Sequence, residues 1–144
     1  FTNWPFLLPV YSYALYFVDS SGRIQLCTSY CGTPEYAPPE ILRHCPYNPS
    51  LSDCFSLGVM LYLLATWTLP FGQGAAIRTK SGIRAQYSRI KENKWRVVAE
   101  LERDIALRAL VGRLLSFEPK LRLTSAQVLT HEWIRPNLSD QSDG

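Results

Sequence analysis

The chain of 144 residues has no closely paired cysteines, little net charge and no glycine-rich run that could hold phosphates. Its four cysteines, at positions 27, 31, 45 and 54, form no C-x-x-C pair, so the short ligand spacings of zinc sites are missing. We therefore expect reduced thiols, which suit the cytoplasm, and no metal site. The formal net charge of +3 gives no reason to expect a nucleic-acid partner.

The first 18 residues contain no charged side chain and are rich in aromatic residues. They have neither the basic start nor the small-residue cleavage site of a secretory signal. A helix that spans a bilayer needs about 20 apolar residues, and this shorter stretch is interrupted by Pro5 and Pro9. A membrane role is therefore not expected.

The rest of the chain has the composition of a globular domain. Hydrophobic residues make up 47% of the sequence and charged residues 19%, which argues against disorder. Residues 55–67 are apolar almost all round, as expected of a helix inside a protein, and Ser52 is the candidate N-cap. Asp53 would then lie in the first turn, where an anion is favourable. Strand signals are scarce, so we predict a mainly α fold.

Residues 77–94 predict a basic surface helix that is interrupted or delayed by Gly82. The segment contains six basic side chains: Arg78, Lys80, Arg84, Arg89, Lys91 and Lys94. One interpretation is a docking patch for an acidic partner. The commoner explanation of such a charge run is a solvated helix face.

Two further helices are predicted toward the C-terminus. Residues 104–117 have apolar side chains at helical spacing, with Pro119 beyond their end. Thr124 and Gln127 have the spacing of a capping box that opens the last helix. The buried side of that helix is predicted from its apolar residues, which are Val128, Leu129, Trp133 and Ile134.

Five short motifs follow one another along the chain. The run C-G-T-P-E-Y-A-P-P-E occupies residues 31–40, and D-C-F-S-L-G occupies residues 53–58. P-F follows at 70–71, P-K-L-R-L-T at 119–124 and H-E-W-I at 131–134. In this order they resemble the C-terminal lobe (C-lobe) of eukaryotic Ser/Thr protein kinases, from the end of the activation segment to the last helix.

The resemblance covers residues 19–135, where we expect a partial kinase domain: a C-lobe without the N-lobe or the catalytic loop. Residues 1–18 are expected to be an apolar, aromatic segment unrelated to kinases, and residues 136–144 a flexible tail. The D-S-S-G-R run at 19–23 and the A-P-P-E sequence at 37–40 are most similar to the testis-specific serine kinase branch.

The resemblance implies a buried ion pair and an anchor on the central helix. Glu40 is expected to meet Arg122 in a forked carboxylate–guanidinium pair that ties the activation segment to the helical core. The alternative is two exposed, unpaired charges. Asp53 matches the residue that holds the backbone of the catalytic loop in the family.

The same resemblance implies substrate-side and regulatory residues. Thr33, Pro34 and Glu35 match the segment that lies against the substrate, with Thr33 beneath the reactive hydroxyl. A plain turn threonine is the alternative for Thr33. Ser29 matches the activation-loop phosphorylation site, and Thr28 is the neighbouring alternative. A phosphate at either position needs an arginine cluster to bind it.

The chain lacks every motif that handles ATP in this family. No G-x-G-x-x-G-x-V, V-A-I-K, H-R-D-L or D-F-G occurs, and the position expected for D-F-G, residues 9–11, reads P-V-Y. None of those three side chains can hold Mg²⁺, which prefers carboxylate oxygens. We expect no catalytic, cofactor-binding or metal-binding residues in this chain, and ATP and Mg²⁺ only in a full-length kinase.

Three functions are compatible with these residues. The chain is part of a Ser/Thr kinase that is active in a longer form, or a truncated pseudokinase that binds other proteins, or an unrelated helical interaction domain. The expected partners are a protein substrate, or a partner kinase or regulatory protein. In the first two cases Glu40 and Arg122 lie together, whereas in the third they lie far apart.

Overall fold

The structure, a computed structural model, describes residues 21–23, 25–30, 32–72, 75–95 and 97–135. The segments predicted at 1–18 and 136–144 lie outside these residues. The predicted mainly α fold is confirmed, because the described part consists of helices and loops. Its β structure is a single isolated bridge, in which Cys27 and Tyr47 pair in antiparallel fashion.

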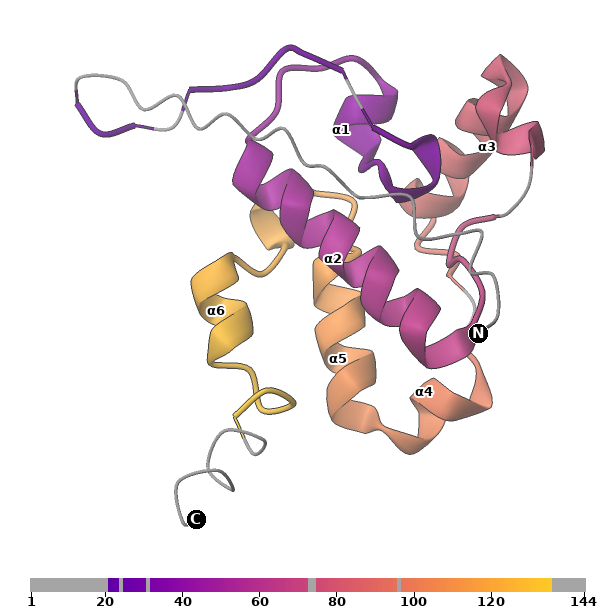
Figure 1. Cartoon of the computed structure of the whole chain (residues 1–144), viewed down its shortest axis with the longest axis vertical. Helices are drawn as coiled ribbons and strands as arrows, with labels where there is room; N and C mark the ends of the chain where they lie inside the picture. Colours follow the sequence, from indigo (N-terminus) through magenta and orange to yellow (C-terminus); the bar gives the residue numbers. More distant parts are fainter. Residues whose placement is uncertain (1–20, 24, 31, 73–74, 96, 136–144) are drawn as a thin grey trace, which may run out of the picture.

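Six α-helices and three 3-10 helices follow one another in the described part of the chain (Figure 1). The α-helices are α1 (Pro39–Leu42), α2 (Pro49–Thr66), α3 (Lys80–Lys91), α4 (Ala99–Arg103), α5 (Ile105–Leu114) and α6 (Ser125–Leu129). The 3-10 helices are η1 (Pro34–Tyr36), η2 (Ala75–Arg78) and η3 (Pro119–Leu121).

Helix α2 runs through the middle of the molecule (Figure 1). It packs against α5, α4 and η1, while α1 packs against α3. In the view of Figure 1, α1 and α3 lie above α2, and α5 and α6 lie below it. Helices α1 and α3 and the C-terminal helices are therefore on different sides of one central helix.

Helix α2 begins earlier than the sequence predicted. Its N-cap is Asn48, whose side chain accepts a hydrogen bond from the Ser50 N–H at 3.0 Å, and Pro49 occupies the first helical position. Proline is favoured there because its fixed φ suits the helix and its missing N–H has no intrahelical partner to lose. The prediction of Ser52 as N-cap is wrong, and Asp53 lies in the second turn.

The prediction that α2 lies inside the protein holds for one of its faces. Phe55, Val59 and Tyr62 are fully buried, whereas Leu64 is 64% exposed and Trp67, the C-cap, is 71% exposed. Among the described residues, α2 is the one helix long and apolar enough by composition to cross a membrane. Because its buried face packs against α4 and α5, we describe it as a core helix.

The basic segment predicted as one helix over 77–94 is divided between η2 and α3. Thr79 is the N-cap of α3, and its hydroxyl accepts a hydrogen bond from the Gly82 N–H at 3.1 Å. Gly82 therefore takes part in starting the helix and does not interrupt it. Gln86 and Ile90 form the buried side of α3.

The helix predicted over 104–117 ends at Leu114, and the short α4 in front of it was missed. Asp104 separates the two helices and caps α5, because its Oδ1 accepts from the Leu107 N–H at 2.8 Å. Its Oδ2 accepts from the Trp133 indole Nε1–H at 2.9 Å. Asp104 thus also joins the start of α5 to the segment that follows α6.

The capping box predicted for the last helix is confirmed. The Thr124 hydroxyl accepts from the Gln127 N–H at 3.3 Å, and the Gln127 side chain accepts from the Thr124 N–H at 2.9 Å. Val128 is buried, but Leu129 is 65% exposed, so its predicted burial is wrong. Neighbouring helical residues point about 100° apart, so Leu129 faces away from the core that Val128 enters. Trp133 packs half-buried against the same core.

Helices α2 and α5 approach closely at Gly58. A Cβ atom added there would lie 2.7 Å from the Leu114 Cβ and 3.1 Å from Leu115 Cδ2. The Leu114 Cβ cannot move without its backbone, so the glycine is required by the distance between the helices. Gly112 on α5 is different, because an added Cβ would meet only Trp95 Cζ2, at an ordinary 3.5 Å.

We predict that Gly58→Ala lowers the free energy of unfolding by about 1–3 kcal/mol, since overpacking forces α2 and α5 apart. Chemical denaturation followed by far-UV circular dichroism measures the change. Gly112→Ala is the matched control and should be neutral or stabilising by up to about 1 kcal/mol, because alanine is the better helix former. Equal effects of the two substitutions would contradict the assigned contact.

Candidate functional site

Two prolines determine where the short helices of the segment from Thr33 to Glu40 begin. Pro34 opens η1 and Pro39 opens α1, in each case at a position where the ring fixes a helical φ. The Tyr36 N–H donates to the Thr33 carbonyl at 3.1 Å, which closes the first of these turns. Two short turns in succession carry the chain into α1 and direct the Glu40 side chain toward the core.

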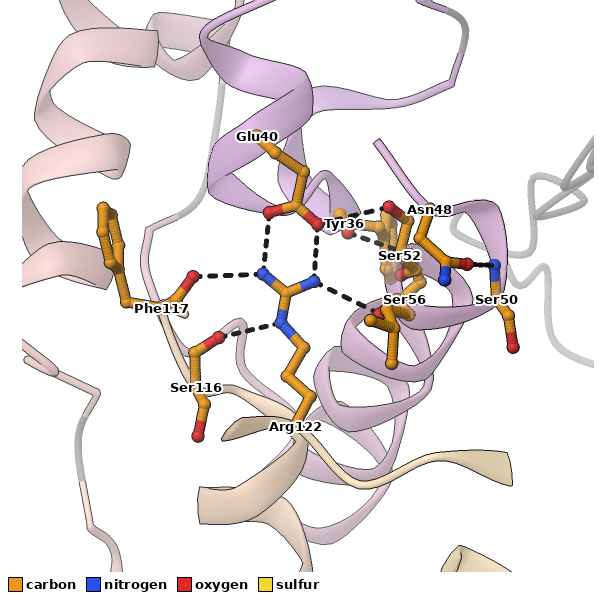
Figure 2. Close-up of polar contacts among 10 residues, drawn as sticks. Tyr36, Glu40, Asn48, Ser50, Ser52, Ser56, Ser116, Phe117 and Arg122 are labelled. Atoms are coloured by element: carbon orange, nitrogen blue, oxygen red, sulfur yellow. Dashed lines mark hydrogen bonds and ion pairs between the residues drawn. The ribbon is translucent and has the colours of Figure 1, made fainter. Parts of the chain in front are cut away.

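Glu40 and Arg122 form the ion pair expected from the sequence (Figure 2). Arg122 Nη1 donates to Glu40 Oε1 at 2.6 Å, and Nη2 donates to Oε2 at 2.7 Å. The guanidinium is completely buried and the carboxylate side chain is 11% exposed. The alternative of two exposed, unpaired charges is therefore wrong.

Every N–H of the Arg122 guanidinium has an acceptor. Besides the two bonds to Glu40, Nε donates to the Ser116 carbonyl at 2.8 Å, and Nη2 to the Phe117 carbonyl at 3.2 Å. Nη1 also donates to the Leu51 carbonyl at 3.2 Å. Arginine has five such donors, so none is left without a partner in this low-dielectric position.

Side chains of α2 complete the surroundings of this pair. The Phe55 ring lies under the guanidinium, 5.0 Å from its Cζ, in a cation–π arrangement. The Ser52 hydroxyl donates to Glu40 Oε1 at 3.3 Å, and the Ser56 hydroxyl donates to the Tyr36 carbonyl at 3.1 Å. Helix α2 thus binds both ends of the segment that carries Glu40 (Figure 2).

Of the predicted substrate-side residues, Pro34 and Glu35 lie on η1 and Thr33 is its N-cap, and η1 contacts both α2 and α3. The Gln86 side chain of α3 donates to the Pro34 carbonyl at 2.8 Å. Glu35 Oε1 lies 3.6 Å from Arg78 Nε, whereas Glu35 Oε2 is buried without a hydrogen-bond partner. Thr33 is half-buried, and its side chain makes no capping bond to η1. These contacts hold the backbone of η1 in one position.

Tyr36, the last residue of η1, packs between the predicted substrate-side residues and the core. Burial, and to a smaller extent the neighbouring Glu35 carboxylate, raise the pKa of the Tyr36 phenol above its usual value. The phenol therefore stays neutral at physiological pH. Its ring packs against the core cluster that contains Phe55 and Val59.

The two predicted phosphorylation sites, Ser29 and Thr28, are both exposed. The Ser29 carbonyl accepts a hydrogen bond from the Tyr47 hydroxyl at 2.8 Å. Cys27 and Tyr47 also exchange backbone hydrogen bonds, of 2.8 and 3.0 Å. The loop that carries both hydroxyls is thereby fastened to the connection between α1 and α2.

Asp53 lies half-buried on α2. At the next residue, burial, and then the Asp53 charge, raise the pKa of the Cys54 thiol. The assigned role of Asp53 concerns a catalytic loop, so that role stays a prediction. Within the described residues there is no group of three His, Cys, Asp or Glu side chains that could hold a metal ion.

The sequence reasoning missed several residues of this site. Gln86, Ser52 and the carbonyls that receive the Arg122 donors were not identified, because a backbone acceptor leaves no signal in the sequence. Tyr47 was also missed. The P-x-x-R motif did locate Arg122, and the A-P-P-E run located Glu40.

Comparison with known proteins adds to these observations. The protein kinase domain family matches residues 16–134. CBL-interacting protein kinase 29 of Oryza sativa subsp. japonica is 37% identical over 109 residues, which cover 76% of this chain and 23% of that protein. Serine/threonine-protein kinase H1 of Mus musculus is 38% identical over 105 residues, covering 72% of this chain and 23% of that protein.

Testis-specific serine/threonine-protein kinase 1 of Mus musculus is 31% identical over 126 residues, which cover 88% of this chain and 33% of that protein. Its identity is lower than that of the two relatives above, so the comparisons do not single out this branch. The chain spans about a quarter to a third of the length of these curated relatives.

We predict that Glu40→Gln destabilises the chain by about 3–5 kcal/mol, because it leaves the Arg122 charge buried without its counter-charge. Thermal and urea denaturation measure the loss. Arg122→Lys should also be costly, since an ammonium group cannot reach the same five acceptors.

Glu92→Gln is the matched control for this substitution. Glu92 pairs with Lys94 at the surface, where both side chains are more than half exposed, so its replacement should change stability little. If Glu40→Gln were as well tolerated as Glu92→Gln, the pair would not hold the activation segment on the core.

Proposed function

The chain belongs to the protein kinase family, and on that premise we propose that it is the substrate-side part of a Ser/Thr protein kinase. Its reaction is the transfer of phosphate from ATP to serine or threonine hydroxyls of proteins. The interpretation as an unrelated helical domain is wrong, given the family match over residues 16–134. The observation that carries the proposal is the saturated Glu40–Arg122 pair, which fastens the end of the activation segment to the helical core.

The role proposed for residues 33–35 is to hold a substrate peptide. Orienting a reacting hydroxyl requires a rigid support, because small displacements of the reacting atoms are costly in rate. Thr33, Pro34 and Glu35 have such support: Gln86 holds the Pro34 carbonyl from α3, and the Glu40–Arg122 pair holds the chain that follows. We place Thr33 beneath the substrate hydroxyl.

We propose that residues other than 33–35 carry out the phosphoryl transfer itself. Phosphoryl transfer needs a cover for the phosphates, a lysine, Mg²⁺ ligands and a residue that orients the nucleophile. The printed sequence has none of the corresponding motifs. We therefore propose that ATP and Mg²⁺ are bound by a full-length kinase, and that this chain by itself neither binds nucleotide nor transfers phosphate.

Phosphorylation of Ser29, or of Thr28, is proposed as a regulatory event. Both hydroxyls are exposed and lie on the activation-segment side. The Tyr47 hydroxyl already holds the Ser29 backbone at 2.8 Å, which supports a loop that is partly ordered before any phosphate is added.

The finer assignment to the testis-specific branch is also a proposal. It is supported by the D-S-S-G-R run at 19–23 and the A-P-P-E sequence at 37–40, and by testis-specific relatives at 31% identity. We also propose that the chain is cytoplasmic and that its partners are proteins. We propose no nucleic-acid partner and no membrane association.

A truncated pseudokinase that acts as a protein-binding module is the second candidate. It is supported by the sequence P-V-Y at residues 9–11, where the resemblance places D-F-G. The two candidates differ in whether this chain supports phosphoryl transfer when the missing motifs are supplied.

We predict that Mg-ATP does not change the melting temperature of the isolated chain, since it contains no residues for the phosphates or the metal. Differential scanning fluorimetry with and without saturating Mg-ATP measures this. Serine/threonine-protein kinase H1, assayed in parallel, controls for the method. A clear upward shift for the isolated chain would show that nucleotide binding lies in residues to which we assign none.

We predict that residues 19–135 support catalysis when they replace the matching segment of serine/threonine-protein kinase H1. The chimera should phosphorylate a serine peptide, and Thr33→Ala in it should lower kcat/KM by about tenfold or more if Thr33 positions the substrate hydroxyl. Thr130→Ala, an exposed threonine at the end of α6, is the matched control and should have little effect. A folded chimera without activity would favour the pseudokinase.

A further inference from the structure

Helix α3 carries a stripe of positive charge on its outer face. Lys80, Arg84 and Lys91 are exposed, and their spacing of four and seven residues places them on one side of the helix together with Tyr87. The 12 residues of α3 include four basic side chains and no acidic one. This stripe was singled out in the sequence and is not used by the substrate-side surface.

Other basic residues of the same region already have structural partners. Arg89 donates from Nη1 to the Phe71 carbonyl at 2.8 Å, and Arg78 lies against Glu35. Lys94 pairs with Glu92. Arg84, by contrast, makes no ion pair with any residue that the structure describes. Its charge is therefore available to a partner.

A groove between α1 and α3 borders this stripe at Arg84 and Tyr87. Its main cavity has a volume of about 400 Å³ and is lined by Leu42, Arg43, Ile83, Arg84, Tyr87 and Ser88. A second hollow of about 160 Å³ shares Arg43 and Tyr87 with the first and continues to Phe117 and Glu118. We call the two together the α1–α3 groove.

The middle of the α1–α3 groove is ordered by contacts within the chain. Arg43 Cζ lies 5.6 Å from the centre of the Tyr87 ring, and Arg43 Nη1 donates to the Tyr87 hydroxyl at 3.3 Å. The Phe117 ring meets Tyr87 edge-on, with centroids 5.5 Å apart. The guanidinium of Arg43 is thus held over an apolar floor before any partner arrives, which lowers the entropic cost of binding.

We propose that the α1–α3 groove binds an acidic, partly apolar peptide segment of a partner protein. An apolar side chain of the partner fits on the floor formed by Leu42 and Ile83. Its neighbouring carboxylates lie against the Arg43 and Arg84 guanidinium groups, whose planar donors suit carboxylates. This surface lies apart from Thr33–Glu35, and the proposal does not depend on phosphoryl transfer.

The lining of the groove favours a protein over a nucleic acid. A nucleic acid would need cations that follow its backbone and an aromatic face on which a base can stack. The whole chain has a net charge of only +3, and Arg43 and Phe117 already cover the Tyr87 ring. Glu40 and Glu118 line the second hollow and would repel phosphates or carboxylates there, so the carboxylates of the peptide lie at the Arg43 and Arg84 end of the groove.

The test uses the purified full chain and a display library of short random peptides. Peptides enriched on the immobilised chain are synthesised with a fluorescent label, and their affinity is measured by fluorescence anisotropy. We expect sequences with several carboxylates around an apolar residue, and binding that weakens as salt is raised.

Two charge reversals then locate the binding site. Arg84→Glu should weaken the enriched peptide by at least about tenfold, because it places a carboxylate against carboxylates. Arg108→Glu changes the net charge equally but lies exposed on α5, away from the groove, so its effect should stay below about twofold. A peptide with lysine in place of glutamate should regain affinity for the Arg84→Glu variant, a result that a merely structural role of Arg84 would not produce.

Each other outcome overturns the proposal. Absence of any enriched peptide, enrichment of peptides without acidic residues, or equal loss in the two variants would show that the groove is not an acidic-peptide site. If heparin or single-stranded RNA displaced every peptide and bound with higher affinity, the stripe would instead be a general polyanion surface. The nucleotide and chimera experiments test the proposed kinase function. A result against that function would therefore not affect the outcome of the peptide-binding test.

Discussion

The buried contact between the Glu40 carboxylate and the Arg122 guanidinium is the constraint on which the rest of the structure depends. Taking two charges out of water costs several kcal/mol for each, and their attraction offsets this cost only where the remaining donors are also satisfied. Here Arg122 has an acceptor for all five N–H groups, from Glu40, Leu51, Ser116 and Phe117. Those acceptors lie in separate segments, so the pair can form only when α1, the start of α2 and the loop before η3 are all in place. The contact therefore makes the irregular segment of residues 33–40 part of one cooperative unit.

This dependence explains how a short segment with little regular structure can present a defined surface. η1 and α1 have only three and four residues, too few to be stable alone. They are held from α2 by Ser52 and Ser56, and from α3 by Gln86. Helix α3 also borders the α1–α3 groove, which lies between the two helices. Different side chains of α3 therefore serve the two regions: Gln86 holds η1, whereas Ile83, Arg84, Tyr87 and Ser88 line the groove.

The sequence predicted much of this arrangement, and its errors have local physical causes. Glu40 and Arg122 were identified because short motifs mark them, and the Thr124 capping box was identified because its residue types have one obvious use. The start of α2 was placed at Ser52 because serine is a good cap, but Asn48 followed by proline is a stronger start signal. Helix α4 was missed because five residues are too few to show a period. The predicted burial of Leu129 was wrong because it directly follows the buried Val128, and neighbouring side chains of a helix point about 100° apart.

The residues alone determined the family, the mainly α fold and the charge pair, because each of these depends on residue types at short spacings. Only the tertiary structure decided which groups receive the Arg122 donors, how closely α2 and α5 approach at Gly58, and that Arg43 stacks on Tyr87 across 44 residues of chain. Neither the backbone groups that accept hydrogen bonds nor the distances between helices can be read from the residue types. They arise when segments far apart in the chain are packed together, and the surface that a partner would meet arises in the same way.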